Sequence, residues 1–143
     1  MPPAHPDSNE RLARETLLDK VGIPESQIHP LRSTGVELPT RFDLILLGLG
    51  PDGHTASLFP GRPELEATEP IAFVPEPGRP PPHPRYTFTF PLLNRGPLVA
   101  ILVAGAAKRD ILARVLAGDE SLPAARVHAA ETVVLADEAA APG

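Results

Sequence analysis

The chain has 143 residues and contains no cysteine, which excludes a disulfide scaffold and any thiolate chemistry. No apolar run approaches the roughly 18 residues that a membrane span needs. The first ten residues also lack the basic and apolar regions of a secretory signal. We therefore expect a cytoplasmic protein that does not enter a membrane. The length fits one domain, residues 1–143.

Basic residues are few, with 13 against 18 acidic residues and a net charge of −5. This balance argues against nucleic-acid binding, because affinity for the phosphate backbone needs a basic face. One small anionic ligand is still possible, since a local site can hold it against the overall field. Only two lysines occur, Lys20 and Lys108.

Prolines divide the chain into regular elements and loops, with nine of the 20 between Pro60 and Pro84. Cap-type residues at Asp7 and Ser8, followed by Gly22 and Pro24, predict a first helix between them. A second helix should lie between Gly105 and Gly118, and the Ala-rich tail after residue 136 should fray. A short extended piece is expected at 27–31. Apolar runs predict strands at 42–47, 71–74, 86–90, 98–103 and 132–136.

Alternation of strands and helices predicts an α/β layered sheet. The nearly continuous apolar character of 42–47 is typical of a parallel strand covered on both faces. Only ten residues separate Leu31 from Phe42, which is too few for a parallel crossover. Either 27–31 and 42–47 are not parallel neighbours, or a helix is missing between them.

A glycine-rich turn follows the strand 42–47, and it carries the most informative polar residues. Gly50 and Gly53 let the backbone turn sharply and expose N–H groups to an anion. Imidazole is the side chain best suited to move a proton near neutral pH, and Asp52 lies two residues from His54. The turn therefore predicts a site at the carboxyl edge of the sheet.

Competing interpretations of this turn are weaker. The six residues from Gly48 to Gly53 match a dinucleotide fingerprint, but Pro51 removes an N–H from the phosphate cradle and Pro60 shortens the following helix. Ser57 is not in a nucleophile elbow. The other histidines show no metal-ligand spacing, so the sequence predicts no metal; they are His5, His29, His83 and His128.

The segment FDLILLGLGPDGHTASLFPG, residues 42–61, resembles the signature of the glucosamine-6-phosphate isomerase/6-phosphogluconolactonase family. The resemblance extends to residues 5–31, 80–118 and 122–127. It implies an open, mostly parallel Rossmann-like sheet with helices on both faces, in three αβα layers. It also implies a monomeric hydrolase without a cofactor that acts on 6-phospho-D-glucono-1,5-lactone, in the pentose phosphate pathway.

The same resemblance implies roles for individual residues. His54 would activate water for attack on the lactone carbonyl, and Asp52 would orient it. The N–H groups around Gly50 and Gly53 would hold the oxyanion. Lys108 would bind the substrate phosphate. Arg85 is a weaker candidate for the same anion, because an exposed arginine without a binding role is equally expected at the start of a strand.

Departures from the family pattern leave alternatives open. Related isomerases, which also deaminate, carry a glutamate where this sequence has Phe59, which favours the lactonase branch. The N-terminal strand and phosphate loop of such lactonases are not found, and the ten-residue link replaces a longer crossover. The alternatives are therefore an impaired, truncated remnant with weak sugar-phosphate binding, or an isomerase-like activity. A missing strand would also leave a sheet edge or an apolar face unpaired, which invites aggregation or association.

Overall fold

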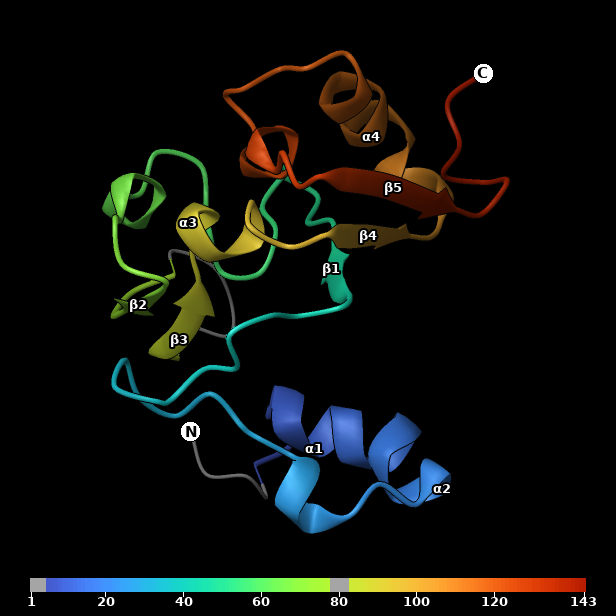
Figure 1. Ribbon diagram of the computed structural model, residues 1–143. Coiled ribbons are helices and arrows are strands. Elements are labelled where there is room, and N and C mark those ends of the chain that lie inside the picture. Colours follow the sequence, from blue (N-terminus) through green and yellow to red (C-terminus); the bar gives the residue numbers. More distant parts are fainter. Residues whose placement is uncertain (1–4, 78–82) are drawn as a thin grey trace.

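Two small sheets organise the computed structural model, which describes residues 5–77 and 83–143 (Figure 1). The first is a parallel sheet in the order β1-β4-β5, and the second is an antiparallel pair of β2 and β3. The chain therefore has an α/β fold with an open parallel sheet. The strands are β1 (Ile45–Gly48), β2 (Ile71–Val74), β3 (Arg85–Phe88), β4 (Leu98–Val103) and β5 (Glu131–Ala136).

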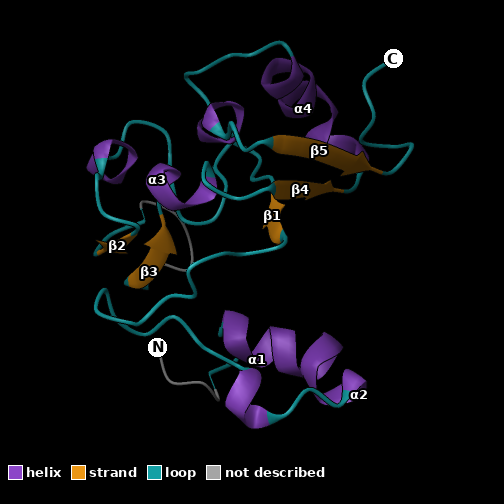
Figure 2. Ribbon diagram, viewed as in Figure 1, coloured by secondary structure: helices purple, strands orange, loops and turns teal. Residues whose placement is uncertain are grey.

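Short helices and turns connect these strands (Figure 2). The first helical segment consists of α1 (Asn9–Ala13), a π-helical stretch (Arg14–Leu18) and α2 (Asp19–Val21). Later come α3 (Phe90–Leu93) and α4 (Arg109–Leu116), besides single 3₁₀ turns. No helix in the described part of the chain is both long and apolar enough to cross a membrane.

The ends of the first helical segment follow the predicted chemistry. The Ser8 hydroxyl accepts a hydrogen bond from the backbone N–H of Arg11 at 3.3 Å, so Ser8 is the N-cap. Gly22 ends the segment in the left-handed conformation, with φ at +67°. Three of its apolar side chains, Leu12, Leu17 and Val21, are nevertheless exposed. The segment lies apart from the parallel sheet (Figure 1).

The extended piece predicted at 27–31 is not a strand. A 3₁₀ turn at Glu25–Gln27 is followed by irregular chain up to β1. The ten-residue link therefore joins no two parallel neighbours, which resolves the conflict that the sequence raised.

One face of the parallel sheet carries the core. Val99 and Ile101 of β4 are almost completely buried, and α4 covers this face with its apolar side. Helix α4 contributes Ile111, Leu112 and Val115, which recur at the spacing of one helical face. The prediction of a helix between Gly105 and Gly118 is confirmed.

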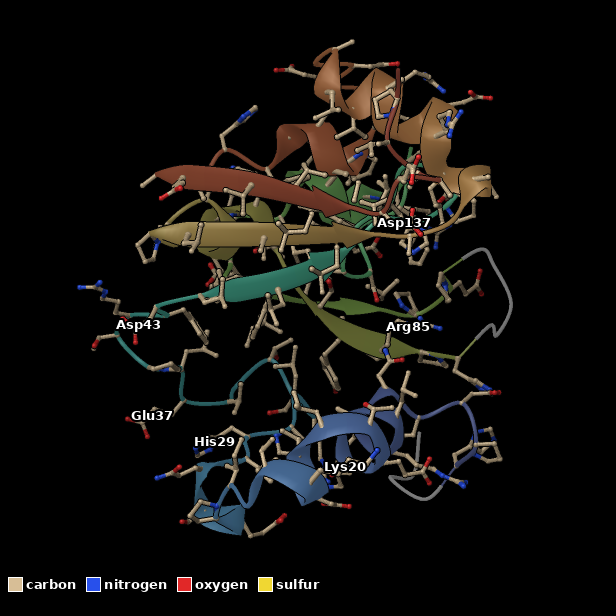
Figure 3. The ribbon with its side chains drawn as sticks, turned by 90° about the vertical axis from the view of Figure 1, so that its right-hand side faces the viewer. Lys20, His29, Glu37, Asp43, Arg85 and Asp137 are labelled. Carbon is tan, nitrogen blue, oxygen red and sulfur yellow. The ribbon has the colours of Figure 1, made fainter. Side chains whose placement is uncertain are left out.

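The other face of the same sheet is exposed. Leu46 of β1, Leu102 of β4 and Leu135 of β5 keep 57%, 47% and 57% of their surface accessible. No helix crosses in front of these strands in the view of Figure 3. The expectation that the first of these strands is covered on both faces is therefore wrong for the described residues, although the apolar pattern of the strand is present.

The C-terminal tail is ordered, and the expectation that it frays is wrong. Ala140 has no accessible surface. The Asp137 carboxylate accepts hydrogen bonds from the backbone N–H of Ala140 at 2.8 Å and from that of Gly105 at 3.0 Å. This one side chain joins the tail to the loop after β4, a long-range contact that composition does not reveal.

Adjacent residues of β4 test the two faces of the sheet. We expect Ile101→Ala to lower the free energy of unfolding by about 2–5 kcal/mol, because it leaves a cavity in the core. Leu102→Ala should change it by no more than about 0.5 kcal/mol, as for other exposed positions. Urea unfolding followed by circular dichroism measures both. A comparable loss in Leu102→Ala would contradict the exposed face and indicate that something covers it in solution.

Candidate active site at the turn after β1

The turn after β1 is closed by its own backbone. The N–H of Gly50 donates to the carbonyl of His54 at 2.8 Å, and the N–H of Gly53 donates to the carbonyl of Gly50 at 3.0 Å. The Thr55 hydroxyl donates to the carbonyl of Gly48 at 2.9 Å, which ties the end of the turn back to the strand. These bonds hold residues 48–55 in one compact loop at the carboxyl end of β1.

Two glycines are required here for different reasons. A Cβ on Gly50 would lie 2.0 Å from His54 Nδ1, so only glycine leaves room for the imidazole. Gly53 has a φ of +81°, and a Cβ there would also approach the Leu122 side chain to 2.8 Å. The N–H groups of these two glycines donate within the turn, so an oxyanion at this loop would meet other N–H groups around them.

His54 and Asp52 form the polar centre of the turn. His54 Nδ1 lies 2.5 Å from Asp52 Oδ1, and the Phe59 ring packs against the imidazole with 4.5 Å between centroids. An Nδ1–H donated to the carboxylate leaves the lone pair on Nε2. About a quarter of the His54 side chain is exposed. The arrangement therefore presents a positioned base that solvent can reach.

The pKa of Asp52 lies below its usual range. Burial raises this pKa, but the hydrogen bond from His54, the His54 charge and backbone hydrogen bonds together lower it more. The carboxylate consequently stays ionised and remains an acceptor for the imidazole. A depressed pKa stabilises the fold at pH values above the unfolded-state pKa, and this contribution is lost as pH falls through the folded-state pKa.

Lys108 lies at the same turn. It ends the 3₁₀ turn Ala106–Lys108 immediately before α4, and its Nζ donates to the carbonyl of Leu49 at 2.7 Å. Leu49 precedes Gly50, so the ammonium group is next to the loop that carries Asp52 and His54. The structure thus brings five of the predicted residues to one loop: Gly50, Asp52, Gly53, His54 and Lys108.

Asp137 is a residue that the sequence-based prediction missed. Both of its carboxylate oxygens lie 3.0 Å from the backbone nitrogen of Gly105, which has a φ of +92°. Gly105 begins the loop that leads to Lys108, so Asp137 holds the origin of that loop. Figure 3 shows Asp137 where β5 ends, and no local motif links it to the loop after β4.

Arg85 is placed elsewhere, at the first residue of β3. Its Nε donates to the carbonyl of His83 at 3.2 Å, and burial lowers its pKa. It lines a groove of about 1030 Å³ between β3 and the first helical segment, and that groove includes neither His54 nor Lys108. The structure does not bring Arg85 into the His54 turn.

No helix follows the turn, unlike the sequence-based expectation. Residues 54–61 form turns joined by an isolated bridge between Thr55 and Leu58, and Ala56 has a positive φ of 50°. Ser57 is buried, and its N–H donates to the Thr87 hydroxyl at 3.0 Å. Its burial agrees with the interpretation that Ser57 is not a nucleophile.

The chain is similar to proteins of one known family. The family described as glucosamine-6-phosphate isomerases/6-phosphogluconolactonase matches residues 1–135. The chain is 45% identical over 134 residues to a 6-phosphogluconolactonase of Synechocystis sp., and covers 55% of that protein with 79% of its own length. It is 37% identical over 163 aligned positions to the 6-phosphogluconolactonase of Homo sapiens, with 96% of this chain and 62% of that protein covered.

Solved structures agree. A 6-phosphogluconolactonase from Thermotoga maritima has a TM-score of 0.82 at 30% identity, over 95% of this chain and 67% of that one. The chain thus spans about half to three fifths of the length of the curated relatives described above.

The room at Gly50 generates a prediction about Asp52. In Gly50→Ala the new methyl group should displace the imidazole, because that ring can rotate away more easily than the backbone can move. Without its His54 partner, Asp52 should titrate at a higher pH, since burial then dominates. Carboxyl ¹³C NMR titration measures this shift.

Gly48→Ala is the matched control, since a Cβ there meets nothing within 4 Å. It should leave the Asp52 titration unchanged. If Gly50→Ala also titrates as the parent chain does, the glycine is not what makes the contact possible.

Proposed function

The chain belongs to the glucosamine-6-phosphate isomerase/6-phosphogluconolactonase family, and on this basis we propose that it hydrolyses 6-phospho-D-glucono-1,5-lactone to 6-phosphogluconate. The observation that carries the proposal is the contact between His54 Nδ1 and Asp52, which leaves Nε2 as the basic atom in a loop that Lys108 also contacts through the carbonyl of Leu49. The two curated relatives described above are both named 6-phosphogluconolactonase. Activity is proposed here for a single domain formed by residues 1–143.

The proposed reaction uses His54 first as a base and then as an acid. Nε2 takes a proton from water while the water oxygen bonds to the lactone carbonyl carbon. The resulting tetrahedral oxyanion collapses, the bond from that carbon to the ring oxygen breaks, and Nε2–H returns the proton to the ring oxygen. Asp52 stabilises the imidazolium between these steps, and its low pKa keeps it ionised to do so. No step requires a cofactor.

The phosphate group of the substrate needs a cation, and Lys108 is the candidate in contact with the turn. An ammonium at the start of α4 favours an anion, because charge and helix dipole act in the same direction. Arg85, which lines the groove between β3 and the first helical segment, stays only a proposed second contact for this phosphate. Binding energy from the phosphate would orient the lactone against Nε2.

Phe59 favours lactone hydrolysis over the sister isomerisation. The buried Phe59 ring covers one side of the His54 imidazole, at the position where the resemblance implies a glutamate in isomerases. An apolar ring cannot relay a proton, so Asp52 is the carboxylate in contact with His54. A base with one orienting acid is sufficient for hydrolysis, in which a single group shuttles the proton.

His54→Ala tests the proposal directly. We expect the rate above spontaneous lactone hydrolysis to fall by about 10²–10⁴-fold, the usual contribution of a positioned acid–base group. A coupled assay that follows 6-phosphogluconate formation measures this rate.

His128→Ala is the control, because this exposed histidine lies outside the turn. An equal loss in both variants would contradict a specific role for His54. No excess rate in the parent chain would instead support the alternative of an impaired fragment.

Lys108→Met tests the phosphate contact. We expect kcat/KM to fall by roughly 10- to 100-fold, mainly through a higher KM, as for the loss of a hydrogen bond to a charged group. Lys20→Met is the matched control, because Lys20 is the only other lysine and lies on the first helical segment (Figure 3). A fall in kcat with an unchanged KM would contradict the assignment of Lys108 to binding.

A further inference from the structure

Three side chains with metal-ligand chemistry meet outside the candidate active site. His5 and Asp7 precede α1, and His83 precedes β3. One ligand atom from each of the three lies within 4.8 Å of those of the other two. Asp7 Oδ2 lies between the rings, 3.9 Å from His5 Nδ1 and 3.7 Å from His83 Nε2.

The separations are close to those of a bound ion. Two ligands of a tetrahedral zinc ion lie about 3.3 Å apart, given metal–ligand distances near 2.0–2.1 Å. Each of the three side chains is at least one-third exposed. Its end can therefore rotate to close the difference between the observed distances and those around a bound ion. The two imidazole rings already meet edge to face, with 5.2 Å between their centroids. The backbone N–H of Asp7 donates to His5 Nδ1 at 3.1 Å, and this hydrogen bond has to open when the imidazole binds an ion, because it uses the lone pair of the ring.

The donor set selects the class of ion. Two imidazoles and one carboxylate suit Zn²⁺ and neighbouring divalent transition metals, whereas Mg²⁺ and Ca²⁺ prefer oxygen ligands alone. Three protein ligands leave a fourth position for water. The partial exposure of the cluster allows a water to reach that position.

We propose that His5, Asp7 and His83 bind a divalent transition-metal ion of the Zn²⁺ class, which fastens the first helical segment to β3. Few apolar contacts stabilise this segment, because its side chains Leu12, Leu17 and Val21 are exposed. A bound ion would therefore add to its stability. An ion that binds only the folded chain stabilises that chain by mass action. Histidine spacing along the sequence predicted no metal, because the two histidines come together only through the fold.

The experiment is a titration of the tag-free, metal-stripped chain with Zn²⁺ alone, followed by calorimetry. His54→Ala is used as the background, which removes the histidine–carboxylate pair of the candidate active site. We expect saturable binding of one Zn²⁺ per chain and a higher melting temperature in its presence. His83→Ala should weaken binding by at least about tenfold, since even supporting groups of metal sites contribute 10- to 100-fold.

Two further variants separate a ligand from a merely structural histidine. His83→Cys supplies another zinc ligand, so it should retain binding that His83→Ala loses. His29→Ala removes a histidine outside the cluster and should bind as the background does. No saturable binding, or equal binding by the His83→Ala and His29→Ala variants, would overturn the proposal, and neither result depends on lactone hydrolysis.

Discussion

The contact between His54 Nδ1 and Asp52 is the interaction on which the candidate site depends. It orients the imidazole, leaves Nε2 as the basic atom and keeps the carboxylate ionised. The contact exists because Gly50 has no side chain in the space that the ring occupies. The glycine of this turn therefore acts through the volume that it leaves to its neighbour, while its N–H closes the loop.

Those parts of the fold that depend on local pattern could be predicted from the sequence. Strand β4 and helix α4 follow from an apolar run and from apolar residues spaced along one helical face. Local pattern alone did not predict the exposed face of the sheet, because Leu46 and Leu102 are as apolar as their buried neighbours. The part of the family pattern that is not found did point to an unpaired sheet edge or apolar face. A pattern shows which residues avoid water, but not whether another segment is present to cover them. The ordered tail was missed for a similar reason, since Ala140 is buried by contacts from distant parts of the chain.

In the candidate site, too, contacts between neighbouring residues could be predicted from the sequence, whereas contacts between distant residues could not. Asp52 and His54 are two residues apart, so their contact could be predicted from the sequence. Lys108 was identified only through the family resemblance, and its contact with Leu49 spans 59 positions of the chain. The N–H groups of Gly50 and Gly53 close the turn themselves, and the expectation that N–H groups around these glycines hold an oxyanion stays a prediction. Asp137 could not have been found, since no local motif links it to Gly105.

Strand order gives the two halves of this site different resistance to opening. Lys108 follows β4, which is hydrogen-bonded to a strand on each side, whereas the His54 turn follows β1, which pairs with β4 alone among the described strands. Amide protons of an edge strand exchange through smaller fluctuations than those of a central one. His54 therefore follows the more labile strand and Lys108 the more protected one, so that partial unfolding would separate these two side chains before the core is lost.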